Sequence, residues 1–411
     1  MTAPFIIVGA GQAGVQTAEA LRTLAYEGAI LLLGDEPHGP YHRPPLSKAW
    51  LAGEMQEAQL AMRAPEVLVR KNIELRTGTR VTGIDRVARH ITLADGSALE
   101  YAGLVLATGS TPRPLPVPGG DAAGVHMLRS RDDASAIAAR MAQCTERQLP
   151  VVVIGGGFIG LEVAATARKK GLAVTVLEAA PRLLGRVLAP RLSAWFAELH
   201  RGHGVQLVLD AQVAAIVTDA DGAVSAVRMA DGAVFPAAMV VVGIGVSAND
   251  SLARDAGLAC ERGIVVDACG RTSDPLVFAA GDCTARRLAD GALLRLESVQ
   301  NATEQGKSVA AALLGQVRPF AGAPWFWSDQ YDKKLQMAGL SGGADQWVVR
   351  GDMAAGTFSV YYFRAGILVA VDTINAGREH LQARKLMDAG ISPTPEQAAD
   401  TAFDLASLQP K

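Results

Sequence analysis

Two short stretches of the sequence carry glycines at the spacing that binds the phosphates of a nucleotide. The motif GxGxxG is formed by Gly9, Gly11 and Gly14 in "VGAGQAG", and again by Gly155, Gly157 and Gly160 in "IGGGFIG". At this spacing the first glycine allows a tight bend, the second lets the backbone approach a pyrophosphate, and the third lets a helix pack on a strand. The repetition predicts two dinucleotide sites in one chain.

An acidic residue follows each glycine motif at a distance that suits a ribose. Asp35 stands 26 residues after Gly9, and Glu178 stands 23 residues after Gly155. A carboxylate in this position accepts hydrogen bonds from ribose hydroxyls and repels a 2′-phosphate. Because "EAAPRLLGR" places no basic residue directly beside Glu178, we predict that the second site prefers NADH to NADPH.

The residues around each motif predict a strand, a helix and a second strand. "FIIV" precedes the first motif, a helical run ends near Leu24, and "AILLLGD" follows. The second motif lies between "PVVVI" and "LAVTVLE", with a helix to about Lys170 and Gly171 as its cap. A single glycine motif also fits an ordinary tight turn, but two motifs in the same context favour an α/β fold with two nucleotide-binding units.

The rest of the chain supplies connectors and a different C-terminal pattern. "YAGLVLATGSTPRPLPVPGG" at 101–120 joins a strand to a proline-rich connector, and "AAMVVVGIGVSAND" before "DPLVFAAGDCT" is the matching return. Beyond Phe320, "TFSVYYF" and "ILVAVDT" flank the turn "RAG", which predicts a hairpin, and a helical stretch runs from about Arg378 to Ala389.

Composition and charge exclude several classes of protein. The chain has 411 residues, of which 49% are hydrophobic and 19% charged, so it is long enough for two or three domains. Its formal net charge of -2 argues against a nucleic-acid partner, because phosphate neutralisation needs a basic excess. The longest apolar runs, such as 237–246, are too short to cross a membrane. Small molecules or another protein are the expected partners.

The cysteines and histidines predict neither a disulfide nor a metal site. Cys144, Cys260, Cys269 and Cys283 form no CxxC or CxxxxC pair, which is typical of a reducing compartment. "MTAPFIIVGAG" has no signal-peptide pattern, so we expect a cytoplasmic location. "HRGH" at 200–203 lacks a third ligand, and we interpret it as the end of a surface helix at Gly202 or Gly204.

An ordered series of motifs along nearly the whole chain resembles a known family. The motifs are "VGAGQAG", "YHRPPLSK", "LVLATGSTPRPLP", "VVVIGGGFIGLEVAATA", "VVVGIGV", "TSDPLVFAAGDC", "ESVQNATEQG" and "PWFWSDQY". They resemble the FAD-dependent pyridine-nucleotide oxidoreductases, and among these the putidaredoxin reductase-like ferredoxin reductases of cytochrome P450 and Rieske oxygenase systems. The resemblance implies a split FAD domain at 1–112 and 247–319, an NAD domain at 113–246, both Rossmann-like, and a C-terminal α+β domain at 320–411.

The same resemblance implies contacts with each cofactor. The positions implied around FAD are Gly9, Gly11, Ala13, Gly14, Asp35, Arg43, Lys48, Val81, Ala107, Thr108, Arg129, Asp282, Val299, Trp325 and Trp327. The positions implied around NADH are Gly155, Gly157, Ile159, Gly160, Glu178 and Gly245. Arg43 can also serve only the local fold, and one of the two tryptophans can simply anchor the small domain as part of an alternating strand.

The resemblance also implies the catalytic residues Lys48, Glu162 and Pro45. Lys48 in "RPPLSK" resembles a lysine beside the flavin, and Glu162, in the first turn of its helix, resembles an acid within reach of that lysine. A lysine near the flavin steadies negative charge as a hydride arrives, and a carboxylate orients the lysine. The alternative interpretation is a structural salt bridge.

The sequence differs from disulfide-reducing relatives at one position that determines how electrons leave the flavin. Those relatives carry a CxxxxC pair after the first motif, whereas this chain has "GPYHRPPLSKAWL" there. Electrons must therefore leave the flavin directly, and Cys283, next to Asp282, is expected to be only a packed small residue.

Taken together, the resemblance implies a flavoprotein that passes electrons from NADH through FAD, singly, to a 2Fe–2S ferredoxin serving a P450 or Rieske oxygenase. One alternative is a reductase of the same fold that acts on a small acceptor such as a quinone or monodehydroascorbate. A second is a non-catalytic protein resembling apoptosis-inducing flavoproteins, in which NADH binding controls assembly.

Overall fold

The structure is a computed structural model that describes residues 3–288 and 290–409. These residues form two compact units, and each is described by itself. Unit 1 comprises the described residues of Met1–His42, Glu57–Thr111 and Val246–Gly322. Unit 2 comprises those of Arg43–Gln56, Pro112–Gly245 and Ala323–Lys411.

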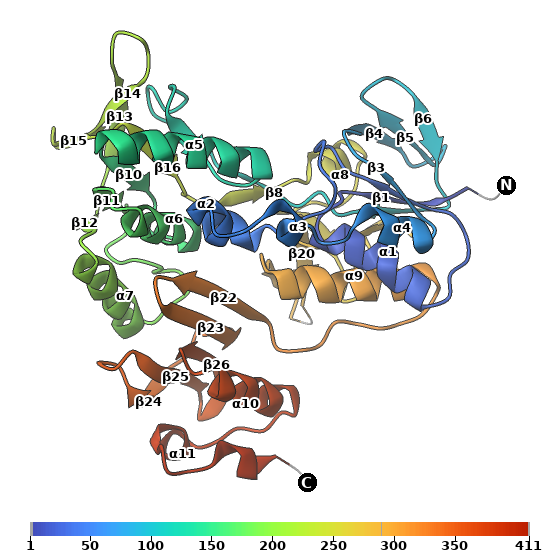
Figure 1. Ribbon diagram of the computed structural model, residues 1–411. Helices are drawn as coiled ribbons and strands as arrows, with labels where there is room; N and C mark the ends of the chain where they lie inside the picture. The colour runs from blue at the N-terminus through green and yellow to red at the C-terminus, as the bar shows by residue number, and fades with distance from the viewer. Residues whose placement is uncertain (1–2, 289, 410–411) are drawn as a thin grey trace. The chain divides into compact units, whose positions relative to one another are not determined.

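Unit 1 is built on a parallel sheet. Its strands are β1 (Phe5–Val8), β2 (Ile30–Leu33), β3 (Ile73–Arg76), β7 (Gly103–Leu106) and β19 (Val277–Ala279), in the order β19-β7-β1-β2-β3. Helices α1 (Gln12–Thr23) and α9 (Val299–Leu313) lie side by side (Figure 1) and pack on Ile7 and Leu32. The sheet is therefore buried on both faces, because Ile6 and Leu31 pack into a second core.

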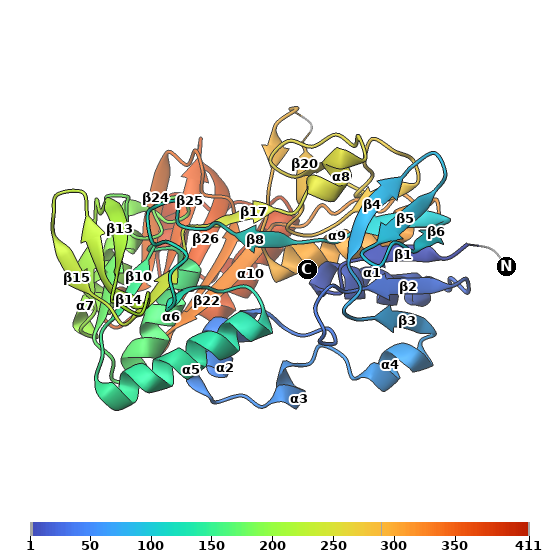
Figure 2. The same cartoon turned by 90° about the horizontal axis from the view of Figure 1, so that it is seen from above.

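The second core of unit 1 lies under small antiparallel elements. Figure 2 shows the sheet of β4 (Val81–Asp85), β5 (His90–Leu93) and β6 (Ala98–Glu100), whose Ile91 and Leu93 belong to this core. The other elements of unit 1 are α3 (Glu57–Leu60), α4 (Pro65–Arg70), β17 (Val246–Ala248), α8 (Ser251–Asp255), β18 (Ile264–Val266), β20 (Thr284–Arg287) and β21 (Leu293–Leu294).

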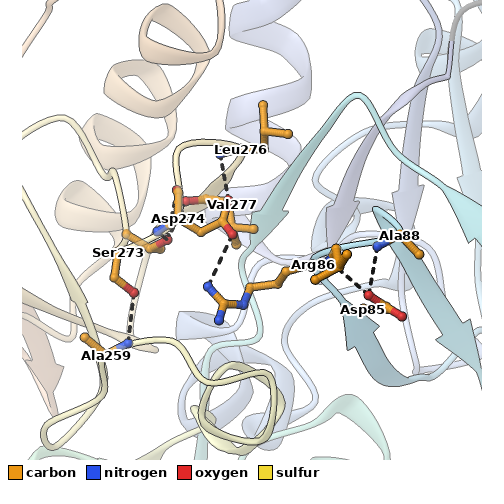
Figure 3. A network of polar contacts seen from close by, with 10 residues as sticks. Asp85, Arg86, Ala88, Ala259, Ser273, Asp274, Leu276 and Val277 are labelled. Atoms are coloured by element: carbon orange, nitrogen blue, oxygen red, sulfur yellow. Dashed lines mark hydrogen bonds and ion pairs between the residues drawn. The ribbon is translucent and has the colours of Figure 1, made fainter.

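A polar network attaches this small sheet to the loop before β19. Arg86, just after β4, forms an ion pair of 3.3 Å with Asp274, as Figure 3 shows. Asp274 also accepts a hydrogen bond from the backbone N–H of Leu276, and the Ser273 hydroxyl accepts one from the N–H of Ala259. These contacts fix the loop that leads into β19.

Unit 2 repeats the same plan. Its parallel sheet has the order β12-β11-β10-β16-β9, with β9 (Val125–Met127), β10 (Val151–Ile154), β11 (Val174–Leu177), β12 (Gln206–Val208) and β16 (Met239–Val242). Val153 packs in one core with α5 (Arg131–Arg147), α6 (Phe158–Lys169) and α7 (Pro190–Gly202). Val152 faces the antiparallel strands β13 (Val213–Thr218), β14 (Val224–Met229) and β15 (Val234–Pro236).

The C-terminal part of unit 2 is an antiparallel sheet with helices. Its order is β22-β23-β26-β25-β24, with β22 (Trp325–Gln330), β23 (Lys333–Gly339), β24 (Gln346–Asp352), β25 (Thr357–Arg364) and β26 (Ile367–Ile374). Helices α10 (Gly377–Asp388) and α11 (Pro395–Ala399) and the 3-10 turn η2 (Leu405–Leu408) follow, the first labelled beside the red strands in Figure 1. The predicted hairpin is confirmed; Ala365 and Gly366 at its turn both have positive φ.

This C-terminal sheet shares a core with the parallel sheet and helices of unit 2. Leu335, Phe358 and Val360 belong to the same buried cluster as Val153 and Leu161. The segment with η1 (Pro44–Ser47) and α2 (Ala49–Ala52) also belongs to unit 2, and β8 (Ser110–Pro112) lies in the connector. The units exchange at Thr111–Pro112, Gly245–Val246 and Gly322–Ala323, and the C-terminal sheet is part of unit 2.

Two general findings follow from the described residues. Parallel sheets with a glycine turn after the first strand, plus an antiparallel C-terminal sheet with helices, confirm the predicted fold class. Within the described part of the chain, no helix is both long enough and apolar enough to pass through a membrane.

Candidate functional site

The two glycine turns have nearly the same backbone. Gly9 has φ of +113° and donates its N–H to the carbonyl of Leu33, while Gly155 has φ of +109° and donates to the carbonyl of Leu177. A Cβ on Gly9 would lie 2.1 Å from the carbonyl oxygen of Ala107, and one on Gly155 would lie 2.4 Å from that of Gly243. Both positions therefore require glycine.

The other two glycines of each motif have different roles. One lets the helix pack on the strand, and the other leaves room for a ligand. A Cβ on Gly14 would lie 1.9 Å from the carbonyl oxygen of Gly9, so this glycine lets the helix lie against the strand, as Gly160 does in unit 2. A Cβ on Gly11 would meet no atom within 4 Å, and one on Gly157 would meet its nearest atom at 3.9 Å. The second glycine of each turn thus faces open space, as a pyrophosphate requires.

The helices that follow these turns begin without a side-chain cap. Neither Gly11 before α1 nor Gly157 before α6 supplies a capping hydrogen bond, and neither first turn has an acidic residue. By contrast, Ser130 caps α5 and Ser298 caps α9. Because the first N–H groups of a helix lack intrahelical partners, α1 and α6 offer them to an anion.

The two acids predicted to bind ribose differ in their surroundings. Glu178 follows β11 directly, and its carboxylate accepts hydrogen bonds from the N–H groups of Gly156 at 2.5 Å and Ala180 at 2.7 Å. It is therefore held at the glycine turn of unit 2. Asp35 lies two residues beyond the end of β2 with an exposed side chain.

Several predicted FAD residues of unit 1 gather around its glycine turn. A Cβ on Gly281 would lie 3.1 Å from that of Ala13, which places the "GDC" turn against the start of α1. Asp282 in this turn accepts a hydrogen bond of 3.1 Å from Ser110. Ala107 follows β7 and touches Gly9 closely, so these residues meet at the carboxyl ends of β1, β7 and β19, where ligands of such sheets bind.

The remaining predicted FAD residues of unit 1 lie in defined positions. Thr108 donates a hydrogen bond of 2.6 Å to the carbonyl of Asn249, whose amide returns one to the carbonyl of Thr108. Val81 begins β4, and Val299 begins α9. The thiol of Cys283 is fully buried, and burial raises its pKa, which supports its interpretation as a packed residue.

In unit 2 the structure brings Lys48 and Glu162 together. The Lys48 Nζ lies 2.7 Å from a carboxylate oxygen of Glu162, which is buried in α6. Lys48 follows η1, in which its N–H donates to the carbonyl of Pro45, so Pro45 shapes the turn that presents the lysine. Glu162 is the fifth residue of α6, so it lies in the second turn and the prediction of the first turn was wrong, because the helix begins at Phe158.

Sequence reasoning missed two serines that share this carboxylate. Ser47 donates a hydrogen bond of 2.5 Å to one oxygen of Glu162, and Ser328 donates one of 2.6 Å to the other. No local pattern in the sequence singles out either serine, and only the structure explains the position of Ser328. Ser328 lies two residues after Phe326 on the same face of β22, and the ring of Phe326 packs on Phe158, one turn before Glu162.

The other predicted residues of unit 2 are also placed. Arg43 donates a hydrogen bond of 2.9 Å to the carbonyl of Arg129, and the rings of Trp325 and Trp327 lie 5.6 Å apart on β22. Ile159 at the start of α6 is 44% exposed, as several other large apolar side chains of the protein are. Gly245 has φ of +109°.

One prediction needs correction at the "HRGH" segment. Helix α7 does end at Gly202, and Gly204 has positive φ, but His200 does not belong to a surface. His200 is fully buried, and its Nε2 lies 2.8 Å from the side-chain oxygen of Gln330. The error arose because a short polar segment at a helix end does not reveal which of its residues faces the core.

Comparison with known proteins supplies the family. The model of the pyridine nucleotide-disulphide oxidoreductase family matches residues 3–306, and a reductase C-terminal model matches residues 325–409. The chain therefore belongs to the pyridine nucleotide-disulphide oxidoreductase family. It is 47% identical over 401 residues to rhodocoxin reductase from Rhodococcus erythropolis, an alignment that covers 97% of this chain and 93% of that protein.

Two solved structures are similar over the whole chain. The ferredoxin reductase for the CYP199A2 system from Rhodopseudomonas palustris has a TM-score of 0.95 and 44% identity, with 99% of each chain covered. The reductase in the covalent putidaredoxin reductase–putidaredoxin complex has a TM-score of 0.94 and 42% identity, with 99% of this chain and 98% of that chain covered. The resemblance inferred from the sequence motifs is confirmed.

Proposed function

We propose that this chain is an NADH-dependent flavoprotein reductase that passes electrons through FAD, one at a time, to a 2Fe–2S ferredoxin. The ferredoxin then supplies a cytochrome P450 or a Rieske oxygenase. The observation that carries this proposal is the full-length similarity to rhodocoxin reductase and to the reductase joined to putidaredoxin. The cysteines are consistent with this proposal, because all four are free and the sequence holds no CxxC or CxxxxC pair.

The two glycine turns have the backbone that each cofactor needs. FAD fits the turn of unit 1, where Gly11 leaves room for a pyrophosphate and the uncapped start of α1 faces it. NADH fits the turn of unit 2 in the same way, with Glu178 in place to accept from a ribose. Bound FAD supplies the chemistry that accepts a hydride and gives up electrons singly.

The residues of this protein do not carry electrons themselves. They hold charged groups in position and compensate charge. Within unit 2, Glu162 holds the Lys48 ammonium in place, and a positive charge of this kind would favour an electron-rich flavin. Ile159 and Gly245 border the nicotinamide side in this proposal, because an exposed apolar side chain and a glycine with positive φ allow a flat ring to approach. We also assign the protein to the cytoplasm, since its four cysteines are free.

A direct assay tests the proposal. The purified FAD-loaded protein is mixed with NADH and a 2Fe–2S ferredoxin, and the bleaching of the ferredoxin is followed by absorbance. We expect two ferredoxins to be reduced for each NADH oxidised, because NADH delivers two electrons and the cluster accepts one. Rapid turnover with a quinone or monodehydroascorbate, without ferredoxin reduction, would instead support a reductase of small acceptors.

A further inference from the structure

The Glu162 carboxylate is the inner end of a buried chain of hydrogen bonds. Its two oxygens accept from three donors, the hydroxyls of Ser47 and Ser328 and the ammonium of Lys48. Ser47, Glu162 and Ser328 are all buried in unit 2. A carboxylate that accepts from three donors has its charge well matched, and its two oxygens are held from two different segments.

The series of hydrogen bonds continues from Ser328 toward His200. The amide nitrogen of Gln330 donates to the Ser328 hydroxyl at 3.1 Å, and the amide oxygen of Gln330 lies 2.8 Å from Nε2 of His200. The other ring nitrogen, Nδ1, lies 3.1 Å from the hydroxyl of Tyr331. Gln330 and His200 are as buried as Ser328, so no bulk water competes for these groups.

Counting the available protons shows that this series of hydrogen bonds can run in only one direction. A serine hydroxyl has one proton, so if Ser328 donates to Glu162 it must accept from Gln330, which then presents its oxygen to His200. That oxygen requires a proton on Nε2 of His200, and Nδ1 then accepts from Tyr331. Burial lowers the pKa of His200 to about 4, so the ring is neutral near pH 7, as this arrangement needs.

From this arrangement we propose that Ser328 is a positioning residue for Glu162, and that Gln330 and His200 fix the direction in which the Ser328 hydroxyl donates. The proposal rests on the proposed function, since Glu162 acts there by holding Lys48. With Ser328 and Ser47 on opposite oxygens, the carboxylate cannot rotate away from Lys48. The lysine ammonium therefore stays in one place while a hydride is transferred.

The first test measures flavin reduction by NADH in stopped flow, without ferredoxin. Ser328→Ala should lower the limiting rate by roughly tenfold while leaving the NADH dissociation constant within about twofold, because the lost hydrogen bond acts on the reacting geometry and not on binding. Ser359→Ala is the matched control. Ser359 is equally buried in β25 of the same sheet and donates to Glu379, outside this chain of contacts, so its rate should not change.

The second test measures the donor direction of these hydrogen bonds without an activity assay. In protein with ¹⁵N-labelled histidine, the nitrogen shifts of His200, assigned by their loss in His200→Asn, should show the proton on Nε2. Ser328→Ala frees the Gln330 amide to turn over, so the His200 signals should change to a mixture of tautomers. Gln330→Met should abolish the Nε2 hydrogen bond and lower the flavin-reduction rate by about twofold to threefold.

Each outcome bears on the proposal. A folded, FAD-loaded Ser328→Ala protein that reduces its flavin at the unaltered rate, or a His200 that carries its proton on Nδ1 in the original protein, would overturn it. If Ser328→Ala does not fold, the rate and His200 shifts of Gln330→Met decide. Failure to reduce ferredoxin would reject the proposed function instead, since neither of these measurements includes ferredoxin.

Discussion

Glu178 connects a single carboxylate to the choice of nicotinamide cofactor. Its oxygens accept from the N–H groups of Gly156 and Ala180, which fixes the negative charge beside the glycine turn of unit 2. Arg182, the next basic residue along the chain, donates to the carbonyls of Gly185 and Leu188 within its own loop. The predicted preference for NADH therefore depends on the repulsive charge of Glu178.

The first prediction concerns this preference. We expect kcat/KM for NADH to exceed that for NADPH by about tenfold or more, and Glu178→Gln to reduce the ratio by roughly tenfold, because the amide keeps an acceptor but loses the charge. Steady-state rates with both cofactors measure the ratio. Glu198→Gln, an exposed glutamate on α7, should leave it unchanged. Equal use of NADPH by the original protein would contradict this interpretation of Glu178.

Asp372 in β26 gives a prediction about pH. It is fully buried, and burial raises its pKa to about 7, although the hydrogen bond of 2.7 Å from Tyr362 opposes that rise. In the unfolded chain the carboxyl loses its proton near its ordinary value of 3.8. Between these values the folded state holds the extra proton, so this residue lowers the free energy of unfolding as pH rises from about 4 to 7.

Asp372→Asn should therefore stabilise the protein in a pH-dependent way. The asparagine cannot ionise but still accepts from Tyr362, so its advantage should be small at pH 4 and of order 2–4 kcal/mol at pH 8. Thermal melting across this range measures it. Tyr362→Phe removes the hydrogen bond and should have the opposite sign, destabilising most at high pH. A constant difference between Asp372→Asn and the original protein at all pH values would refute the assignment.

The pairing of α1 and α9 shows how two helices hold the glycine turn of unit 1 in position. Gly306 of α9 lies so close to α1 that a Cβ would stand 2.9 Å from the carbonyl oxygen of Ala13 and 3.1 Å from Cβ of Gln16. The Gln12 amide donates to the hydroxyl of Thr303 in the same contact. Because α1 begins at the glycine turn, any displacement of α9 also moves that turn.

Gly306→Ala should accordingly destabilise unit 1 and weaken FAD retention. We expect a loss of about 1–3 kcal/mol from overpacking, together with a lower ratio of FAD to protein after purification. Gly202→Ala is a matched control, since Gly202 ends α7 and a Cβ there would meet nothing within 4 Å. Melting temperature and visible absorbance report both effects. Normal FAD content in Gly306→Ala would show that the close approach of α9 is not needed for the turn.

Some structural features of this protein can be predicted from neighbouring residues in the sequence, and others cannot. The glycine turns, the strands beside them and the β25–β26 hairpin depend on residues within about thirty positions, and their patterns predicted them correctly. The contacts of Glu162 with Ser47 and Ser328 span 115 and 166 residues. No periodicity encodes such a meeting; it depends on how the C-terminal sheet packs against α6, which a single sequence does not reveal.

The final prediction tests whether the two turns, so alike in backbone, hold different ligands. Gly11 and Gly157 have ordinary extended conformations with φ of -85° and -84°, and a Cβ meets no close neighbour at either position. An aspartate is therefore tolerated by the fold, while its charge repels a pyrophosphate. Gly11→Asp should yield folded, colourless protein that has lost FAD. Gly157→Asp should stay yellow and be reduced by dithionite but not by NADH.

Absorbance at purification and stopped-flow reduction distinguish these outcomes, and each variant serves as the control for the other. Circular dichroism and melting curves confirm that both chains remain folded. If both substitutions removed FAD, or if Gly157→Asp were still reduced by NADH at the original rate, the assignment of one cofactor to each turn would be wrong. The prediction of a different cofactor for each turn rests on their surroundings, because Glu178 accepts a hydrogen bond from the second turn and the "GDC" segment lies against the first.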